Sequence, residues 1–338
     1  MLKRLMFSLY LGALAAPAWA QTAETAPAAP VAEAAEAVPE QILVTGQRPG
    51  PGLWKISKDD HVLWVFGSYS PLPKNMEWRS RQVESILAGS QEYLKQPMAG
   101  AHVGFFRSLT LLPFVVGLKD NPDGAKLKDV LPADVYARWQ RLKDKYIGKD
   151  NGIESERPIF VADELYSKGL AHAGLSSGGE VYATIDKIVK KNNIKSTSPG
   201  VELEIDSQVK ALRDFKKSTM DDVACFSTTL ERLETDLDAM RVRANAWAVG
   251  DIEAIQKLSY ADRESACKAA LTNSDFLKSQ PGFKDMDARL REVWVTAAEK
   301  SLAANASTFA VLRLKDILDP QGYIAALQAK GYKVEAPQ

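Results

Sequence analysis

Three histidines are the side chains of this sequence best suited to hold a metal ion at neutral pH. His61, His102 and His172 stand far apart along the chain, and no two are spaced three or four residues apart. A separation of three or four residues would place two histidine ligands on one face of a helix, and this chain has no such pair. The sequence therefore predicts surface or hydrogen-bonded histidines, with no metal ligand and no cofactor.

Ser68 and Ser70 are candidate nucleophiles in the segment Gly-Ser-Tyr-Ser-Pro. A serine nucleophile needs a base within hydrogen-bond reach and an oxyanion hole. The segment lacks the Gly-x-Ser-x-Gly pattern of a nucleophile elbow, and the proline after Ser70 favours extended geometry for backbone reasons alone. The chain also has no glycine-rich phosphate loop. No catalytic residue is predicted.

The stretch that must position any such chemistry is 53–73. It has the pattern of two short strands joined by a turn at 58–60. Residues 61–66 form a nearly unbroken apolar run, which is typical of a strand buried on both faces. Gly67 ends this run. A small polar loop at the end of a buried strand is where α/β proteins commonly build sites.

Several segments carry a family resemblance. Gly-Leu-Trp-Lys-Ile at 52–56 and Val-Leu-Trp-Val-Phe-Gly-Ser-Tyr-Ser at 62–70 resemble the opening hairpin of the TraB/GumN family, relatives of Tiki-type metalloproteases. Trp-Ala-Val-Gly-Asp at 247–251 is similar to the family's Trp-x-x-Gly-Asp. The resemblance spans 52–336. It implies an α/β (α+β) fold with a mixed sheet and many flanking helices.

The motifs expected to carry the family's chemistry are altered. In the family a Gly-x-x-His loop follows the hairpin and holds a presumed metal ligand; here Gly67 is kept, but Ser70 replaces the histidine. A second such motif is replaced by Leu-Arg-Leu-Lys at 312–315. Glu202 matches the family's Gly-Leu-Glu-Thr. The resemblance thus implies degenerate positions lining a cleft: Gly67, Ser70, Glu202, Arg313 and Lys315.

Arg313 and Lys315 allow two interpretations. If both face the cleft, together with Arg289 and Arg291, they would suit an anionic ligand rather than a cation. Alternatively, Arg313 and Lys315 point to solvent after a strand, and the sequence does not fix which way they face.

The ends of the chain predict its destination and its domain limits. Residues 1–20 have a charged start, a short apolar centre and a small-x-small cleavage pattern, which predict a signal peptide. Residues 21–51 form an Ala/Pro-rich flexible linker and extended lead-in. The folded domain is predicted at 52–336. We therefore expect a periplasmic protein, or a secreted one, with no transmembrane segment after signal removal.

Charge and composition narrow the possible partners. The chain has 43 basic and 43 acidic residues, a balance that gives no case for nucleic acid. The apolar segment 109–118 is too short to span a membrane and is interpreted as a core helix or a lid over the hairpin loop. Cys225 and Cys267 could form a disulfide in an oxidising compartment or remain buried thiols.

Helical periodicity is expected at 77–88, from Pro158, and at 290–297. It is also expected over Val223 to Leu237, where Thr219 and Asp222 make an N-cap pattern, and from Pro320. The last strand is expected at 332–334.

The best functional interpretation is a non-catalytic member of the TraB/GumN family that binds an unknown envelope protein or small ligand. The alternative is a metal-dependent hydrolase or peptidase that uses atypical residues, with Glu202 as a ligand or base. A third interpretation is a structural helper with no small ligand.

Overall fold

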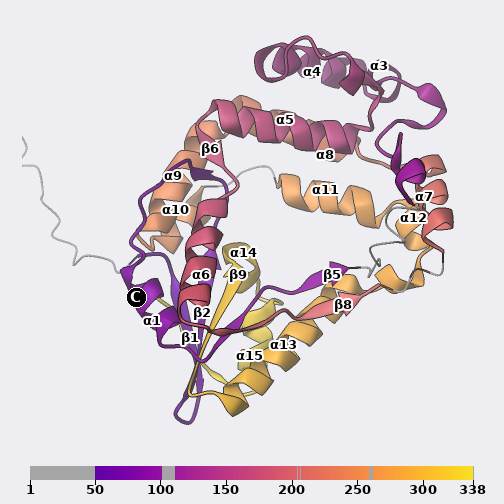
Figure 1. Ribbon diagram of the computed structural model, residues 1–338. Helices are drawn as coiled ribbons and strands as arrows, with labels where there is room; N and C mark the ends of the chain where they lie inside the picture. The colour runs from indigo at the N-terminus through magenta and orange to yellow at the C-terminus, as the bar shows by residue number, and fades with distance from the viewer. Residues whose placement is uncertain (1–49, 101–110, 204, 206, 259–261, 338) are drawn as a thin grey trace, which may run out of the picture. The chain divides into compact units, whose positions relative to one another are not determined.

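The computed structural model describes residues 50–100, 111–203, 205, 207–258 and 262–337 (Figure 1). All of them belong to a unit that spans Gly46–Gln338. The predicted signal peptide at 1–20, almost all of the linker at 21–51, and His102 lie outside the described residues.

A six-stranded mixed sheet organises this unit, as predicted. The strand order is β10-β1-β2-β9-β4-β7. The hairpin strand β1 is antiparallel to both of its neighbours, whereas β2, β9, β4 and β7 run parallel to one another. The strands are β1 Leu53–Lys58, β2 His61–Ser68, β4 Glu92–Leu94, β7 Lys195–Thr197, β9 Ser307–Arg313 and β10 Lys333–Glu335.

Alternating side chains of the sheet meet helices on its two faces. Tyr93 of β4 and Phe309 of β9 have ring centroids 6.2 Å apart on the face that also packs against α1, Arg81–Ala88, and α6, Gly179–Lys191. On the other face Glu92 contacts Ser301 of α13, Met286–Ala304. The helices α14, Leu314–Leu318, and α15, Tyr323–Ala329, complete the chain after β9.

A second apolar cluster holds a layer of helices together. Its members are α3 Leu127–Val130, α4 Ala133–Tyr146, α5 Pro158–His172, α8 Val223–Thr235 and α11 Arg263–Thr272. Trp139 and Phe226 are both fully buried there, with ring centroids 5.6 Å apart. A disulfide between Cys225 and Cys267 joins α8 to α11. Helix α9, Leu237–Ala248, leads from this layer toward the hairpin.

Short elements connect these layers. Two small sheets pair β3 with β6 and β5 with β8. The remaining elements are β3 Leu72–Pro73, β5 Met98–Gly100, β6 Leu175–Ser176, β8 Gly200–Glu202, α7 Gln208–Lys217, α10 Ile252–Lys257, α12 Asp275–Lys278, and the 3₁₀ turns η1 Pro122–Gly124, η2 Gly152–Ser155 and η3 Pro281–Phe283. In the described part of the chain, no helix combines the length and apolarity that a bilayer crossing requires.

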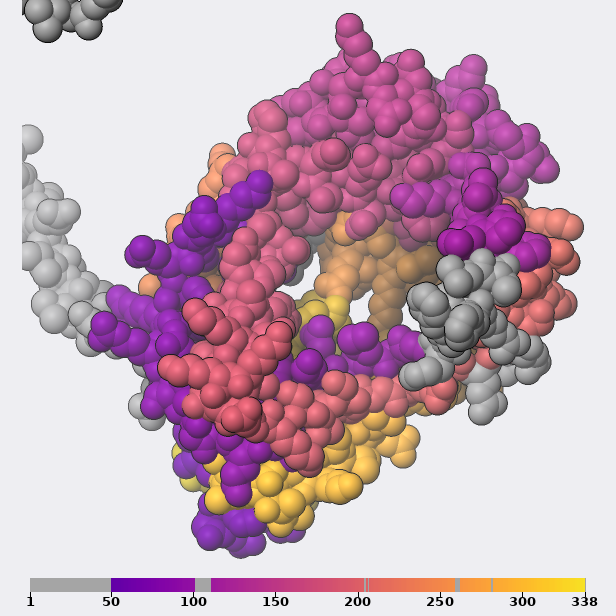
Figure 2. Space-filling model, viewed as in Figure 1, coloured from indigo at the N-terminus to yellow at the C-terminus, as the bar shows by residue number. Residues whose placement is uncertain are grey.

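The apolar segment predicted as a core helix lies on the surface in its described part, residues 111–118 (Figure 2). Leu112 is 57% exposed and Val116 is 74% exposed, so the core prediction is wrong there. The segment contacts α7: the Arg213 guanidinium lies 5.0 Å from the Phe114 ring centroid. This contact joins the described part of the segment to α7.

Tertiary contacts shift two predicted helix starts. The helix expected from residue 77 begins at Arg81, because Trp78 instead packs its ring 5.8 Å from both Phe66 and Trp247. The helix expected from Pro320 begins at Tyr323, because Asp319 first forms a turn. In that turn the Asp319 carboxylate accepts the backbone N–H of Gln321 at 2.8 Å.

The periodic pattern from Val223 to Leu237 forms two helices rather than one. Asp236 ends α8 and precedes α9, and its carboxylate binds two arginines from these helices. The N-cap pattern predicted from Thr219 and Asp222 does not form a side-chain cap: Asp222 stands at the N-cap of α8, and its carboxylate makes no cap hydrogen bond there. The Asp222 carboxylate accepts the backbone N–H of Ile159 at 2.9 Å, which places it at the start of α5 instead.

Candidate strand-end site

The ends of β2 and β9 bring both altered motifs together. The two strands are parallel neighbours, with Gly67 opposite Leu312 and Ser68 opposite Arg313. Segments separated by about 240 residues therefore end at the same edge of the sheet. Parallel strands commonly form sites at this carboxyl edge.

The backbone at Gly67 is held from two sides. The indole N–H of Trp247 donates to the Gly67 carbonyl at 2.7 Å. A Cβ at this position would lie 2.9 Å from the Trp54 ring and 3.2 Å from Leu314, so only glycine fits without displacement of the core. The family-like Trp247 and Gly67 thus contact each other directly.

Neither serine of the loop has the surroundings of a nucleophile. The buried Ser68 hydroxyl donates to the Leu312 carbonyl at 3.2 Å and lies 2.9 Å from the Tyr182 hydroxyl. A carbonyl and a phenol are not general bases at neutral pH. Ser70 is exposed at the following turn. The predicted absence of a catalytic serine remains a prediction, and the geometry of Ser68 favours a structural role.

A buried charge network lies behind the loop. The Arg243 side chain is fully buried and donates to the Tyr69 hydroxyl at 3.0 Å and to the Asp236 carboxylate at 2.5 Å. Arg232 reaches the same carboxylate at 2.6 Å. Burial disfavours the charged form of Arg243, but the bonds to Asp236 and Tyr69 outweigh it and raise the pKa of Arg243. The network anchors the loop to α8 and α9.

Arg313 and Lys315 form ion pairs with carboxylates at the strand end. Arg313 donates to both Asp316 oxygens, at 2.6 and 2.9 Å, and also pairs with Oε1 of Glu264. Lys315 Nζ lies 2.7 Å from Oε2 of the same Glu264. Arg313 is 47% and Lys315 39% exposed at the side chain. Both cations are thus partly exposed and also face a carboxylate, whereas Arg289 and Arg291 donate to the Gly282 and Gln321 carbonyls. Whether the cations line a cleft for an anionic ligand stays a prediction.

Asp262, at the N-cap of α11, belongs to the same charged surface. Burial raises its pKa, but hydrogen bonds from Ser265 and the nearby Lys315 and Arg232 charges outweigh this effect and leave the pKa of Asp262 below its usual value. The Asp262 carboxylate caps α11 by accepting the Ser265 N–H at 3.0 Å. This cap helps to fix the turn that carries Glu264.

Glu202 lies on another element. It ends β8, which pairs with β5 in a separate two-stranded sheet, and its residue is exposed. The register places it opposite Gly100. No contact in the described residues joins Glu202 to the strand-end group of Gly67, Ser70, Arg313 and Lys315.

The histidines of the described residues lie elsewhere. His61 begins β2, at the end of the strand opposite Gly67, and its Nδ1 lies 2.5 Å from the Leu302 carbonyl. His172 ends α5 and packs edge-on against Tyr146. Both positions match the prediction of hydrogen-bonded or surface histidines.

The donor chemistry at the strand ends does not fit the metal implied by the family resemblance. Ser70 offers a neutral hydroxyl, and Arg313 and Lys315 carry positive charge that repels a metal cation. Within the described ranges, no three His, Cys, Asp or Glu side chains are grouped as metal ligands.

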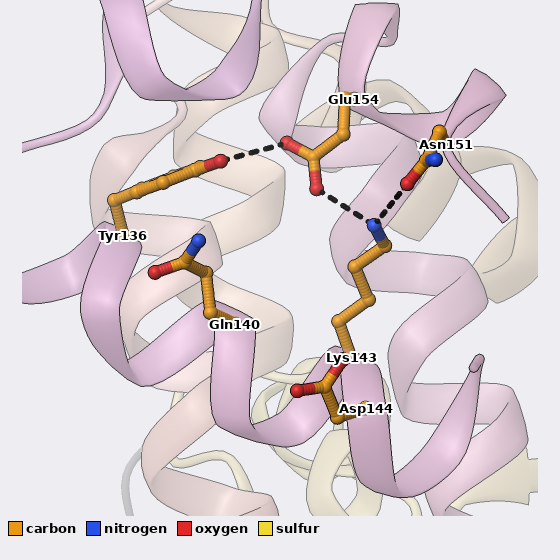
Figure 3. A pocket seen from close by; sticks show the side chains of 6 residues that line it. All are labelled: Tyr136, Gln140, Lys143, Asp144, Asn151 and Glu154. Atoms are coloured by element: carbon orange, nitrogen blue, oxygen red, sulfur yellow. Dashed lines mark hydrogen bonds and ion pairs between the residues drawn. The ribbon is translucent and has the colours of Figure 1, made fainter. Parts of the chain in front are cut away.

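A polar pocket of about 230 Å³ lies apart from this edge, on α4 and η2 (Figure 3). The largely buried Lys143 ammonium lies 3.1 Å from Asn151 and 3.2 Å from Glu154. The Glu154 carboxylate also accepts bonds from the Trp139 indole and the Tyr136 hydroxyl. These groups satisfy one another and hold η2 against α4, so we assign the cluster a structural role.

Sequence reasoning missed two of the important strand-end residues. Arg243 stands one helical turn before Trp247, and that spacing could have placed its side chain near the loop. Glu264 has no comparable signal, because its partners follow 49 and 51 residues later in the chain.

The family-like segments thus meet at one end of a mixed sheet, where Trp247 holds the carbonyl of Gly67. Residues 52–336 match the TraB/PrgY/gumN family. The chain belongs to this family, and the predicted resemblance is confirmed. Comparisons with curated proteins and with solved structures each found no match.

Proposed function

We propose that this protein is a non-catalytic member of the TraB/PrgY/gumN family that acts as a binding or accessory protein of the cell envelope. One observation carries the proposal. After the adjacent strands β2 and β9, the chain carries a hydroxyl at Ser70 and a cation at Lys315, the two positions where the family resemblance implies metal-binding histidines, and Arg313 adds a second cation. The fold and the glycine are kept, whereas the donors for metal chemistry are replaced.

The envelope location rests on two features of the chain. The signal-peptide pattern at 1–20 directs export. The disulfide between Cys225 and Cys267 suits an oxidising compartment such as the periplasm. These features support a protein that works after export, with either a small molecule or another envelope protein as its partner.

Metal analysis of the purified mature protein tests the proposal. We expect no stoichiometric zinc, manganese or cobalt, and no change in melting temperature when a chelator is added. A bound metal would be coupled to folding, so its removal would lower the melting temperature. Peptidase activity should be absent with and without added metal.

The double variant Ser70→His/Lys315→His is the matched control. It returns two nitrogen donors to the neighbouring strand ends, and we expect added zinc to raise its melting temperature. One tightly bound metal per wild-type chain, lost together with hydrolytic activity on chelation, would show that the proposal is wrong. Pull-down from envelope extracts then separates a binding protein from a purely structural helper.

A further inference from the structure

The carboxylate of Glu264 is held like a bound ligand. Its Oε1 pairs with Arg313, and its Oε2 lies 2.7 Å from the Lys315 ammonium, so each oxygen has its own cation. The two cations come from the end of β9 and the first turn of α14, whereas Glu264 comes from α11. The carboxylate of Glu264 on α11 thus lies between the two cations Arg313 and Lys315, which we call the two-cation position.

The Arg313 half of this two-cation position is organised without Glu264. Asp316 accepts two hydrogen bonds from Arg313, one at Nε and one at Nη2. This fork fixes the plane of the guanidinium and leaves Nη1 directed toward the Glu264 carboxylate. A site prepared in this way would lose little freedom when a ligand replaces Glu264.

Helix α11 is also anchored without Glu264. Cys267 is bonded to Cys225, and Arg263 donates to Asp163 at 3.1 Å and to Thr229 at 3.0 Å. The Glu264 side chain is itself 49% exposed. It can therefore rotate into solvent while α11 stays in place, and exposed ion pairs of this kind are weak.

We infer that Arg313 and Lys315 form a carboxylate-binding site, and that Glu264 is an internal occupant that the ligand's carboxylate displaces. The inference rests on the proposed function and gives it a ligand class: a small carboxylic acid, or a peptide with a free C-terminus. Arg313 binds one carboxylate oxygen and Lys315 the other, as they now bind Glu264. Because Glu264 competes from within the same molecule, it lowers the affinity for any such ligand.

The test compares the wild type with Glu264→Gln in a concentration series of succinate at constant ionic strength. Binding is read from the rise in melting temperature and from calorimetry. Removal of the internal competitor should tighten succinate binding about twofold to fivefold, which is the range that weak exposed ion pairs allow. Adding Arg313→Gln to this variant should abolish the gain. Glu253→Gln, which removes an exposed carboxylate paired with Lys257 on α10, should bind succinate as the wild type does.

An alanine tetrapeptide with a free or an amidated C-terminus distinguishes the two ligand sources. If Glu264→Gln binds the free peptide more tightly than the amidated peptide, the site binds peptide C-termini. If Glu264→Gln binds only succinate more tightly than the wild type does, the site binds small carboxylic acids. Glu264→Ala repeats the test should the glutamine variant fold poorly, as judged by circular dichroism.

The inference is overturned if Glu264→Gln and Glu264→Ala bind succinate and the free peptide no better than the wild type. Equal gains in Glu253→Gln, or a response to inorganic phosphate alone, would also overturn it. If the variants show no gain in binding and the purified protein holds no metal, the inference is wrong but the proposed function is not contradicted. Metal-dependent hydrolysis would instead overturn the proposed function, whatever the variants bind.

Discussion

Glu92 shows how a single buried carboxylate can support this sheet. It begins β4, is 4% exposed, and is surrounded by four partners. The Asn305 amide and the Ser301 hydroxyl donate to it at 2.7 and 3.0 Å, Lys195 lies 3.1 Å away, and Thr197 donates to its other oxygen. Burial raises the pKa of Glu92, but these bonds outweigh burial and leave the pKa below its ordinary 4.5.

Glu92→Gln should therefore destabilise the protein in a pH-dependent way. The ionised form of the Glu92 carboxylate is stabilised more in the folded state than in the unfolded state. Its contribution to the free energy of unfolding is therefore fully present above pH 4.5 and is lost as the pH falls through the lower folded-state pKa. We expect the variant to lose about 1–3 kcal/mol of unfolding free energy at neutral pH. Urea unfolding over a pH series measures the loss.

The exposed substitution Glu253→Gln serves as the control and should change stability little at any pH. The difference between wild type and Glu92→Gln should shrink on acidification. A difference that stays constant or grows below pH 4.5 would contradict the role assigned to the ionised Glu92.

Which residues of the site could be predicted depends on how locally their roles are encoded. Gly250 adopts a positive φ of 76°, and the Asp251 carboxylate accepts the Ala254 N–H at 3.0 Å, so the Gly-Asp pair of the local family-like motif ends α9 and caps α10. Gly67 and Ser70 were likewise found from a local motif. Glu264 could not be predicted as a site residue, because its role depends on how two segments that are distant in sequence fold together.

At the scale of elements, the disulfide between α8 and α11 is the clearest constraint. It closes a loop across a sequence separation of 42 residues. In the chain-entropy model such a bond stabilises the folded state by about 4 kcal/mol, because it restricts the unfolded chain. We expect Cys225→Ala/Cys267→Ala to lose a similar unfolding free energy in urea.

Wild-type protein in a dithiol reductant is the matched control, since it also lacks the bond and should approach the stability of the double variant. Titration of the unfolded, unreduced wild type should find no free thiol. Two titratable thiols would show that the bond does not form in the exported protein.

Element types were easier to predict than element boundaries. The hairpin was expected from its apolar runs and its turn, and the long helix α13 from helical spacing at 290–297, and the structure confirms both. The helix at 77–88 starts late because one tryptophan binds in a distant aromatic cluster. The surface position of 111–118 could not be predicted, because an apolar composition does not specify which surface covers it.

At the scale of the whole molecule, the signal-peptide pattern makes a direct prediction. Cleavage after Ala20 should give a mature chain that begins at Gln21, because the small residues Ala18 and Ala20 fit the peptidase. Intact-mass spectrometry of the exported protein measures the start. Ala20→Arg, which places a large charge at the cleavage site, should leave the precursor uncleaved; wild-type protein that keeps Met1 in the membrane fraction would contradict the prediction.

The pairing of β2 with β9 also governs when this protein can fold. Val62 of β2 pairs with Ser307 of β9, and Lys55 of β1 pairs with Glu335 of β10. The first strands of the domain therefore cannot complete their pairing until its last strands are present. A nascent chain that stops short of β9 leaves the apolar β2 with an unpaired edge. Contacts so distant in sequence form slowly. The six-stranded sheet can therefore close only after residues 307–335 have been synthesised and have reached the first two strands.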